Sequence, residues 1–342
     1  MASIMRALKV RIYFAAIVFF STAASAQIFQ LAQLNSNQIR ALDRAKTVVL
    51  IPGGILELHG PYLPSFTDGY VDAFTTEALA RAIVARPGWA VVIFPQVPLG
   101  SGAANAIGGK WSFPGSYAVR TETLRAVYMD LCSELGEQGF RWIFLLNDYG
   151  DPLHARALNQ ASEYFHEVYG GTMVYLRDLL PISTCCDGEE KMFTPAQLAE
   201  EGFTVHAGAD EHSQILFLHP ELVDPAYKNA TSLTAKGMED LFRIAAAKDW
   251  PGYFGAPRLA SAALGASLLT DLVRAESDVT LKILDGLDYR TIPRFSDQFD
   301  PQAIPPLAAE LEHDRQWREK ELDWLKSHSN GDKTKKTSEQ AK

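Results

Sequence analysis

The chain contains 342 residues, of which 47% are hydrophobic and 21% are charged, together with 24 Gly, 18 Pro and 3 Cys. This composition is typical of a globular protein and excludes collagen-like, coiled-coil, low-complexity and disulfide-rich classes. The formal net charge is −9, so the protein lacks the general positive charge that attracts nucleic acid or an anionic membrane surface. We therefore expect no nucleic-acid partner.

The first 26 residues have the layout of a secretory signal peptide. Three basic residues precede nine apolar residues at 12–20, and Ala24-Ser25-Ala26 supplies small side chains for cleavage before Gln27. Nine apolar residues are too few to span a bilayer, although an uncleaved membrane anchor is the alternative interpretation. The sequence therefore predicts an exported protein, periplasmic or secreted, with no membrane contact after removal of residues 1–26.

Short apolar runs rich in Val, Ile and Leu alternate with longer segments of helical periodicity. Continuous apolar strands separated by helices are typical of a mostly parallel sheet that is covered on both faces. In such sheets, functional side chains gather beyond the carboxyl ends of the strands. Strands are expected at 47–51, 90–94, 142–146 and 172–176, and helices at 71–86, 122–138 and 153–168.

The character of the chain changes near its C-terminus. We expect one main domain over 27–295 and a helical extension over 296–327, in which four leucines form one helical stripe beside Trp317 and Trp324. Such a stripe is typical of a helix that docks on another surface, and a neighbouring subunit is one candidate. Residues 328–342 are polar and are expected to form a disordered tail.

No G-x-S-x-G, H-E-x-x-H or Walker-type motif is present, which weakens serine-hydrolase, zincin and nucleotide-binding interpretations. The loop after the first predicted strand carries Glu57, His59 and Asp68, within a stretch constrained by Pro and Gly. Imidazole and carboxylate groups together suit a divalent metal, and Glu57 and His59 point the same way in an extended loop. A second polar cluster lies between His206 and Glu211, ahead of a helical run. Each cluster alone is more typical of an ordinary solvated loop or helix cap.

Five segments resemble the creatininase (creatinine amidohydrolase) family, in the family's order, between residues 43 and 285. The run 51–64 followed by Thr67 and Asp68 resembles its opening signature. Phe113-Pro-Gly-Ser116 resembles the family's Phe-Pro-Gly-Thr segment, and residues 139–147 resemble the strand that leads into its Asn-Gly-His motif. Residues 206–223 resemble its His-Ala-Gly segment, and residues 255–265 resemble its closing Gly-Asp-Pro element.

This resemblance implies a three-layer α/β/α sandwich with a mostly parallel sheet, and assembly as a homo-oligomer, usually a hexamer. It also implies a centre of one or two Zn or Mn ions per protomer that hydrolyses C–N bonds of small, in some cases cyclic, amides through a metal-bound hydroxide. By position, the resemblance assigns the metal ligands and the residue that acts as acid or base. The implied ligands are Glu57, His59, Asp68 and Asp151, with Glu211 supporting the site, and His206 is the implied acid or base.

The chain departs from the family pattern at several of these positions. Tyr149 replaces the His of Asn-Gly-His, Tyr62 replaces a second His in the first loop, and Lys110 lies where relatives place another His. A phenol is a poor metal ligand unless the metal deprotonates it. Tyr149 and Tyr62, together with Lys110, are instead candidates for substrate contacts. Three interpretations are open: an amidohydrolase with an altered site, a catalytically silent relative that binds a small ligand, or a protein with an assembly role.

Overall fold

The computed structural model describes residues 27–181 and 189–329; the predicted signal peptide lies outside these ranges. Five parallel strands form one sheet in the order β1-β3-β2-β4-β5, which confirms the predicted α/β class. Their bounds are Gln27–Gln30 (β1), Thr47–Pro52 (β2), Ala90–Ile93 (β3), Trp142–Leu146 (β4) and Thr172–Tyr175 (β5).

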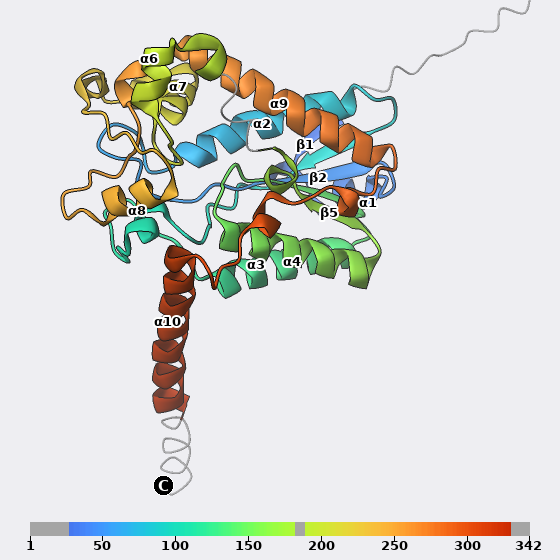
Figure 1. Cartoon of the computed structure of the whole chain (residues 1–342). Coiled ribbons are helices and arrows are strands. Elements are labelled where there is room, and N and C mark those ends of the chain that lie inside the picture. The colour runs from blue at the N-terminus through green and yellow to red at the C-terminus, as the bar shows by residue number, and fades with distance from the viewer. Residues whose placement is uncertain (1–26, 182–188, 330–342) are drawn as a thin grey trace, which may run out of the picture.

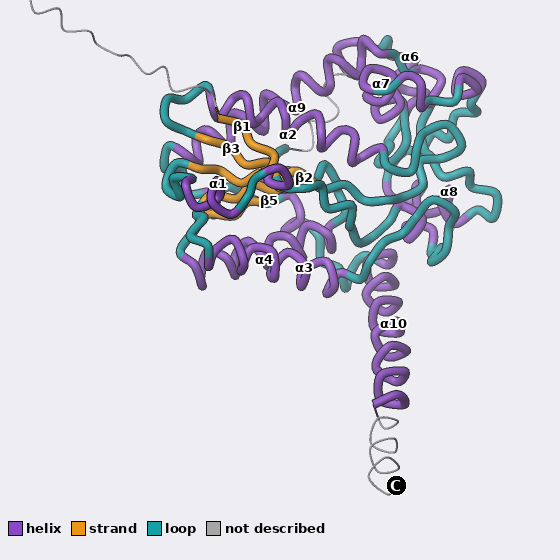
Figure 2. The backbone as a smooth tube through the Cα atoms, turned by 180° about the vertical axis from the view of Figure 1, so that it is seen from behind, coloured by secondary structure: helices purple, strands orange, loops and turns teal. Residues whose placement is uncertain are grey.

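Helices cover both faces of this sheet, as Figures 1 and 2 show, with α2 and α9 on one face and α3 and α4 on the other. The helix bounds are Ser36–Ala41 (α1), Thr67–Val84 (α2), Thr121–Glu137 (α3), Pro152–Tyr169 (α4), Pro195–Glu201 (α6), Ala209–Leu218 (α7), Met238–Ala246 (α8), Ala262–Leu284 (α9) and Pro305–Ser329 (α10).

Alternate residues of each central strand enter opposite cores, because successive side chains of a strand point to opposite faces. Val48 and Leu50 pack with Leu79 of α2 and Ile283 of α9 in one core. Val49 and Ile51 belong to the other core, which α3 and α4 complete. All six residues of β2 are buried, which explains the unbroken apolar run that predicted this strand.

The structure contains elements that were not predicted from the sequence, namely strand β1 and helices α1, α6, α8 and α9, and it starts helix α2 earlier. Strand β1 was not expected, because its Gln-Ile-Phe-Gln sequence is half polar; it pairs only along the edge of the sheet, with β3. Helix α2 begins at Thr67 instead of residue 71, so Asp68 lies in its first turn. Gly69 permits this early start, since a Cβ there would overlap the ring of Phe66.

The predicted C-terminal helix is present as α10, which projects from the body of the molecule (Figure 1). It is attached to the start of α3: the backbone N–H of Thr121 donates to Asp314 at 2.8 Å, and Arg120, the N-cap of α3, pairs with Glu321 at 2.6 Å. Trp324 and Leu325 farther along are 60% and 52% exposed. Residues 328 and 329 still belong to α10, and the rest of the predicted tail lies outside the described residues. Within the described ranges, no helix is long and apolar enough to cross a membrane.

Candidate metal centre

Five of the predicted site residues meet beyond the carboxyl end of β2. Glu57 and His59 come from the loop after that strand, Asp68 from the first turn of α2, and His206 and Glu211 from the start of α7 and the loop before it. His59 is central: its Nε2 lies 3.6 Å from Asp68 Oδ2, 3.5 Å from Glu211 Oε2 and 4.0 Å from Glu57 Oε1. The structure therefore joins the two polar clusters, which are far apart in the sequence.

Hydrogen bonds hold Glu57 with one oxygen turned into this centre. Its Oε2 accepts from the backbone N–H of Ala104 at 2.8 Å and from the hydroxyl of Tyr149 at 3.2 Å. Its Oε1 is buried and has no hydrogen-bond partner among the described residues. That oxygen is therefore free to bind a ligand.

The tautomer of His59 follows from its own hydrogen bond. Its Nδ1 lies 3.2 Å from the carbonyl oxygen of Glu57, and a carbonyl only accepts, so Nδ1 carries the hydrogen. In a neutral imidazole, Nε2 then presents a lone pair toward the carboxylate oxygens of Asp68 and Glu211. Lone pairs facing one another in a buried site are unfavourable unless a proton or a cation lies between them. An imidazole whose other nitrogen donates to a carbonyl is the usual arrangement of a metal-binding histidine.

His206 is oriented in the same manner. Its Nε2 donates to the carbonyl of Leu58 at 2.6 Å, and its Nδ1 lies 3.3 Å from Glu57 Oε1. The following residue, Ala207, has a φ of +50°, a backbone conformation that is rare outside glycine. The N–H of Ala207 donates to Glu211, so one hydrogen bond at His206 and another at Ala207 fix these two residues beside the centre.

Burial dominates the electrostatics of the centre. Burial raises the pKa of Glu57 to about 8, with a smaller contribution from the charge of Glu211. It also raises the pKa values of Asp68 and Glu211 well above their usual range. The same burial lowers the pKa of His59 well below its usual value and that of His206 to about 4. A protein without metal therefore has neutral imidazoles beside carboxyl groups that retain protons, and a divalent cation would reverse the protonation of the carboxyl groups.

The residues fit a divalent metal. Two groups of three have their ligand atoms within 4.8 Å of one another: Glu57, His59 and His206, and His59, Asp68 and Glu211. Nitrogen and carboxylate-oxygen donors in this mixture suit Zn or Mn. The two groups share His59, but its one free nitrogen can bind a single ion, so only one of the two groups can use it at a time.

The other predicted site residues do not belong to these two groups. Asp151 belongs to neither group; its carboxylate is the N-cap of α4 and accepts from the N–H of His154 at 2.7 Å. The Tyr149 hydroxyl borders the centre but bonds Glu57 and the carbonyl of Gly102. Lys110 donates its ammonium to the carbonyls of Ala245 and Ala247 at the end of α8.

Tyr62 lies beside the centre, with its ring centroid 6.1 Å from that of His212. His212 was not among the predicted site residues. It lies on α7 and is fully buried, and its Nε2 has no partner among the described residues. Its position directly after Glu211 was the available signal. Asp72, one helical turn after Asp68, is likewise buried and was also missed; it accepts from the backbone N–H of Asp148 at 2.7 Å.

A mostly parallel sheet with buried histidines and carboxylates gathered beyond its strands defines an α/β protein with a candidate metal centre. The family model "Creatininase: Creatinine amidohydrolase" matches residues 32–279. The chain therefore belongs to the creatininase family.

Two relatives are peptidases by name. The mycofactocin precursor peptide peptidase of Mycolicibacterium smegmatis is 25% identical over 252 residues, covering 72% of this chain and 89% of the relative. The protein of the same name from Mycobacterium ulcerans is 26% identical over 254 residues, covering 71% and 88%. This chain is similar to both over most of their length.

Solved structures of creatininases share the fold. The structure titled "Creatininase Mn" matches with a TM-score of 0.56 and 18% identity, covering 75% of this chain and 99% of its own. A creatinine amidohydrolase matches with a TM-score of 0.55 and 19% identity, covering 74% and 97%. A variant creatininase of "Zn-Zn type" matches with a TM-score of 0.53 and 19% identity, covering 74% and 97%. Helix α10 lies beyond the residues matched by the family model.

Proposed function

We propose that this protein is a metal-dependent hydrolase that cleaves a C–N bond of a small amide, either cyclic or peptide-like. The observation that carries the proposal is the unprotonated Nε2 of buried His59, which faces the carboxylates of Asp68 and Glu211 at 3.6 and 3.5 Å. The family is described as creatinine amidohydrolase, and two relatives are named as peptidases. Both names denote cleavage of C–N bonds and so support this substrate class.

His59, Asp68 and Glu211 would hold the more firmly bound ion, Zn or Mn, because they supply one nitrogen and two carboxylates. A divalent ion bound there would acidify a water molecule and polarise an amide carbonyl. Glu211 is the most accessible of the three, with a side chain 21% exposed against 0% and 5% for the other two, so substrate would approach from its side.

His206 is suited to move the proton. Because its Nε2 hydrogen is committed to Leu58, only Nδ1 is free to accept a proton and to deliver it to the leaving nitrogen. Its pKa of about 4 in this buried setting keeps Nδ1 unprotonated at neutral pH. Glu57, 3.3 Å from that nitrogen, would bind a second ion or hold the proton in transit.

One observation favours a second candidate, a catalytically silent protein that binds a small ligand at the same place. Burial raises the pKa of Tyr149 well above its usual value, so its hydroxyl stays protonated and is occupied by Glu57 and Gly102. The residue that stands where the family has an imidazole therefore offers no ligand in this arrangement.

Metal content of the purified protein separates these candidates. Elemental mass spectrometry without added metal should find one or two equivalents of zinc or manganese per protomer. Asp68→Ala should lose most of this metal, whereas Asp130→Ala, at an exposed position of α3, should keep it. A wild-type protein that holds no metal even after incubation with zinc or manganese would refute the hydrolase proposal.

The proposal also includes export directed by residues 1–26. It further includes assembly as a homo-oligomer, a hexamer as in the family. N-terminal sequencing of protein recovered from the periplasm or medium tests the first, with Gln27 as the expected new N-terminus. Light scattering of the purified protein tests the second.

A further inference from the structure

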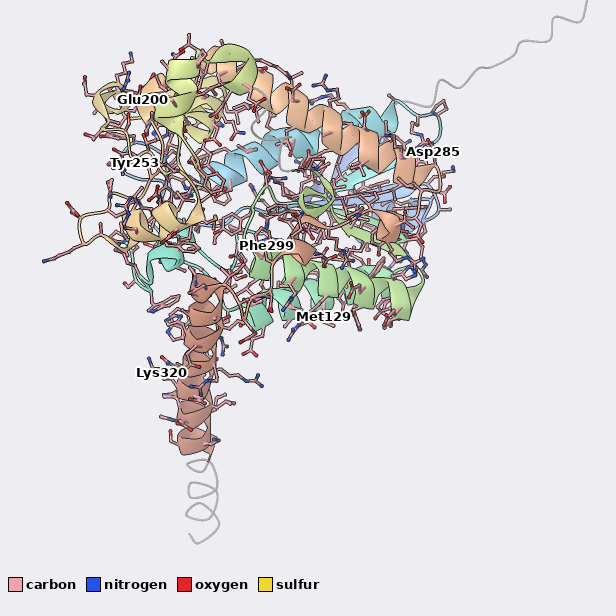
Figure 3. The ribbon with its side chains drawn as sticks, viewed as in Figure 1. Met129, Glu200, Tyr253, Asp285, Phe299 and Lys320 are labelled. Carbon is pink, nitrogen blue, oxygen red and sulfur yellow. The ribbon has the colours of Figure 1, made fainter. Side chains whose placement is uncertain are left out.

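A second group of acidic residues lies near the start of α7 and is separate from the two groups of the candidate metal centre. Glu201 ends α6, Asp210 lies in the first turn of α7, and Glu189 precedes α6. Their ligand atoms lie within 4.8 Å of one another. Glu200, the residue before Glu201 in α6, is labelled in Figure 3 and shows where this group lies in the molecule.

Oxygen atoms converge on the space beside Gly208. A Cβ built on this residue would lie 3.0 Å from Thr204 Oγ1 and 3.1 Å from Asp210 Oδ1, and it would overlap Glu201 Oε1. The glycine therefore leaves room for a small occupant among these oxygens.

Several of these oxygens have no partner among the described residues. Glu189 is only 8% exposed, yet its buried Oε1 makes no hydrogen bond, and the same holds for Thr204 Oγ1 and Asp210 Oδ1. Buried polar atoms are nearly always paired, so an unpaired carboxylate oxygen aimed at two other carboxylates points to a missing partner.

Backbone N–H groups bond Glu201 and Asp210, but none bonds Glu189 among the described residues. Glu201 accepts from the N–H groups of Ala209 at 2.8 Å and Ala256 at 2.6 Å. The nearby cations are paired elsewhere, Lys191 with Asp271 and Arg258 with Glu200. No cationic side chain in the part of the chain that the structure describes therefore pairs with Glu189 or Asp210.

We propose that Glu189, Glu201 and Asp210, with Thr204, form a binding site for a hard divalent cation of the calcium type. All the donors are oxygens, which excludes a preference for zinc and favours calcium or magnesium. Calcium accepts irregular sets of oxygen ligands, whereas magnesium requires a nearly octahedral set, so three carboxylates from separate segments suit calcium better. The ion would tie α6 to the segment that carries His206 and Glu211.

Calcium binding to the full-length protein after chelator treatment tests this site. Isothermal titration with calcium chloride alone should show one equivalent bound, together with a rise in the melting temperature. Glu189→Gln should weaken binding at least tenfold and abolish the rise, and Glu190→Gln, at the exposed neighbouring position, should change neither. Thr204→Val should weaken binding less than Glu189→Gln does, because it removes a neutral donor.

His59→Ala separates this site from the proposed hydrolytic centre, because it removes the ligand shared by both groups there. Calcium binding that survives His59→Ala and fails in a folded Glu189→Gln protein supports the proposal, whether or not the protein holds zinc or manganese. No calcium binding by the wild type would overturn it. So would binding that His59→Ala abolishes or that Glu189→Gln leaves intact.

Discussion

His206 donates its Nε2 hydrogen to the carbonyl oxygen of Leu58 at 2.6 Å, across 148 residues of sequence. Leu58 lies between Glu57 and His59, so this hydrogen bond fastens the His206 segment to the middle of the first loop. It also determines which nitrogen of His206 faces Glu57. The orientation and the tautomer of the proposed proton carrier thus depend on one backbone carbonyl.

His59 belongs to both groups of the centre, so its removal should weaken the binding of an ion at either position. We expect His59→Ala to weaken zinc or manganese binding by more than about 100-fold, because partners that only support a ligand already contribute about 10–100-fold. Equilibrium dialysis with elemental analysis measures this. His219→Ala, at a side chain 40% exposed, is the control and should bind like the wild type. Equal metal binding by both variants would contradict the assignment.

Tyr149 should contribute to stability through its hydroxyl. Tyr149→Phe removes the donor to Glu57 and Gly102 and should lower the free energy of unfolding by about 1–2 kcal/mol, since it leaves buried acceptors unpaired. Denaturant unfolding followed by circular dichroism measures the loss. Tyr149→His restores the imidazole of the family pattern and should bind zinc more tightly than Tyr149→Phe. Identical zinc affinities of the two variants would show that position 149 does not face the metal.

Stability of the metal-free protein should fall between pH 6.5 and 8. Glu57, with a pKa of about 8, and Glu276, also about 8, bind protons more strongly in the folded than in the unfolded chain, where their pKa is near 4.5. Their contribution is complete below pH 4.5 and is lost as the pH rises through 8.

The buried histidines act in the opposite sense at lower pH. His154 and His206 have folded pKa values of about 3 and 4, so their contribution is present above the unfolded value of 6.5 and is lost as the pH falls. Each histidine of the unfolded chain is already half neutral at pH 6.5, so above this pH the more numerous carboxyl groups of raised pKa dominate the change in stability. Melting curves in chelator at pH 6.5, 7.2 and 8 should show a falling midpoint, and manganese should reduce the fall. A midpoint that rises over this range would contradict the buried, protonated state of these carboxyl groups.

Glu310 should destabilise the protein at pH 8. It is 6% exposed on α10, and its burial, with the nearby charges of Asp151 and Asp314, raises its pKa well above the usual value. Glu310→Gln removes the need to bury a charge and should raise the free energy of unfolding by about 1 kcal/mol. Glu319→Gln, exposed on the same helix, should stay within about 0.5 kcal/mol of the wild type. No gain, or a loss, from Glu310→Gln would show that this carboxylate has a favourable partner.

The sequence by itself determined the sheet and half of the centre. Apolar runs predicted four of the five strands, because the residues of central parallel strands are buried on both faces. The edge strand β1 escaped prediction because half of its residues are polar. Glu57 and His59 were predicted as neighbours because two residues of an extended loop share one direction, and their ligand atoms lie 4.0 Å apart.

The family resemblance implied the distant members of the site, but only the tertiary structure decided that Asp68, His206 and Glu211 meet at His59 and that Asp151 does not. Helix α7 brings Glu211 to His59, whereas the loop before α4 turns Asp151 into a helix cap and the loop at Lys110 turns its ammonium to α8. Each of these outcomes depends on where a loop finds backbone groups to bond, and those groups belong to elements far away in the sequence. A residue's type limits the chemistry that it can perform, but the packing of the helices around the sheet selects its partner.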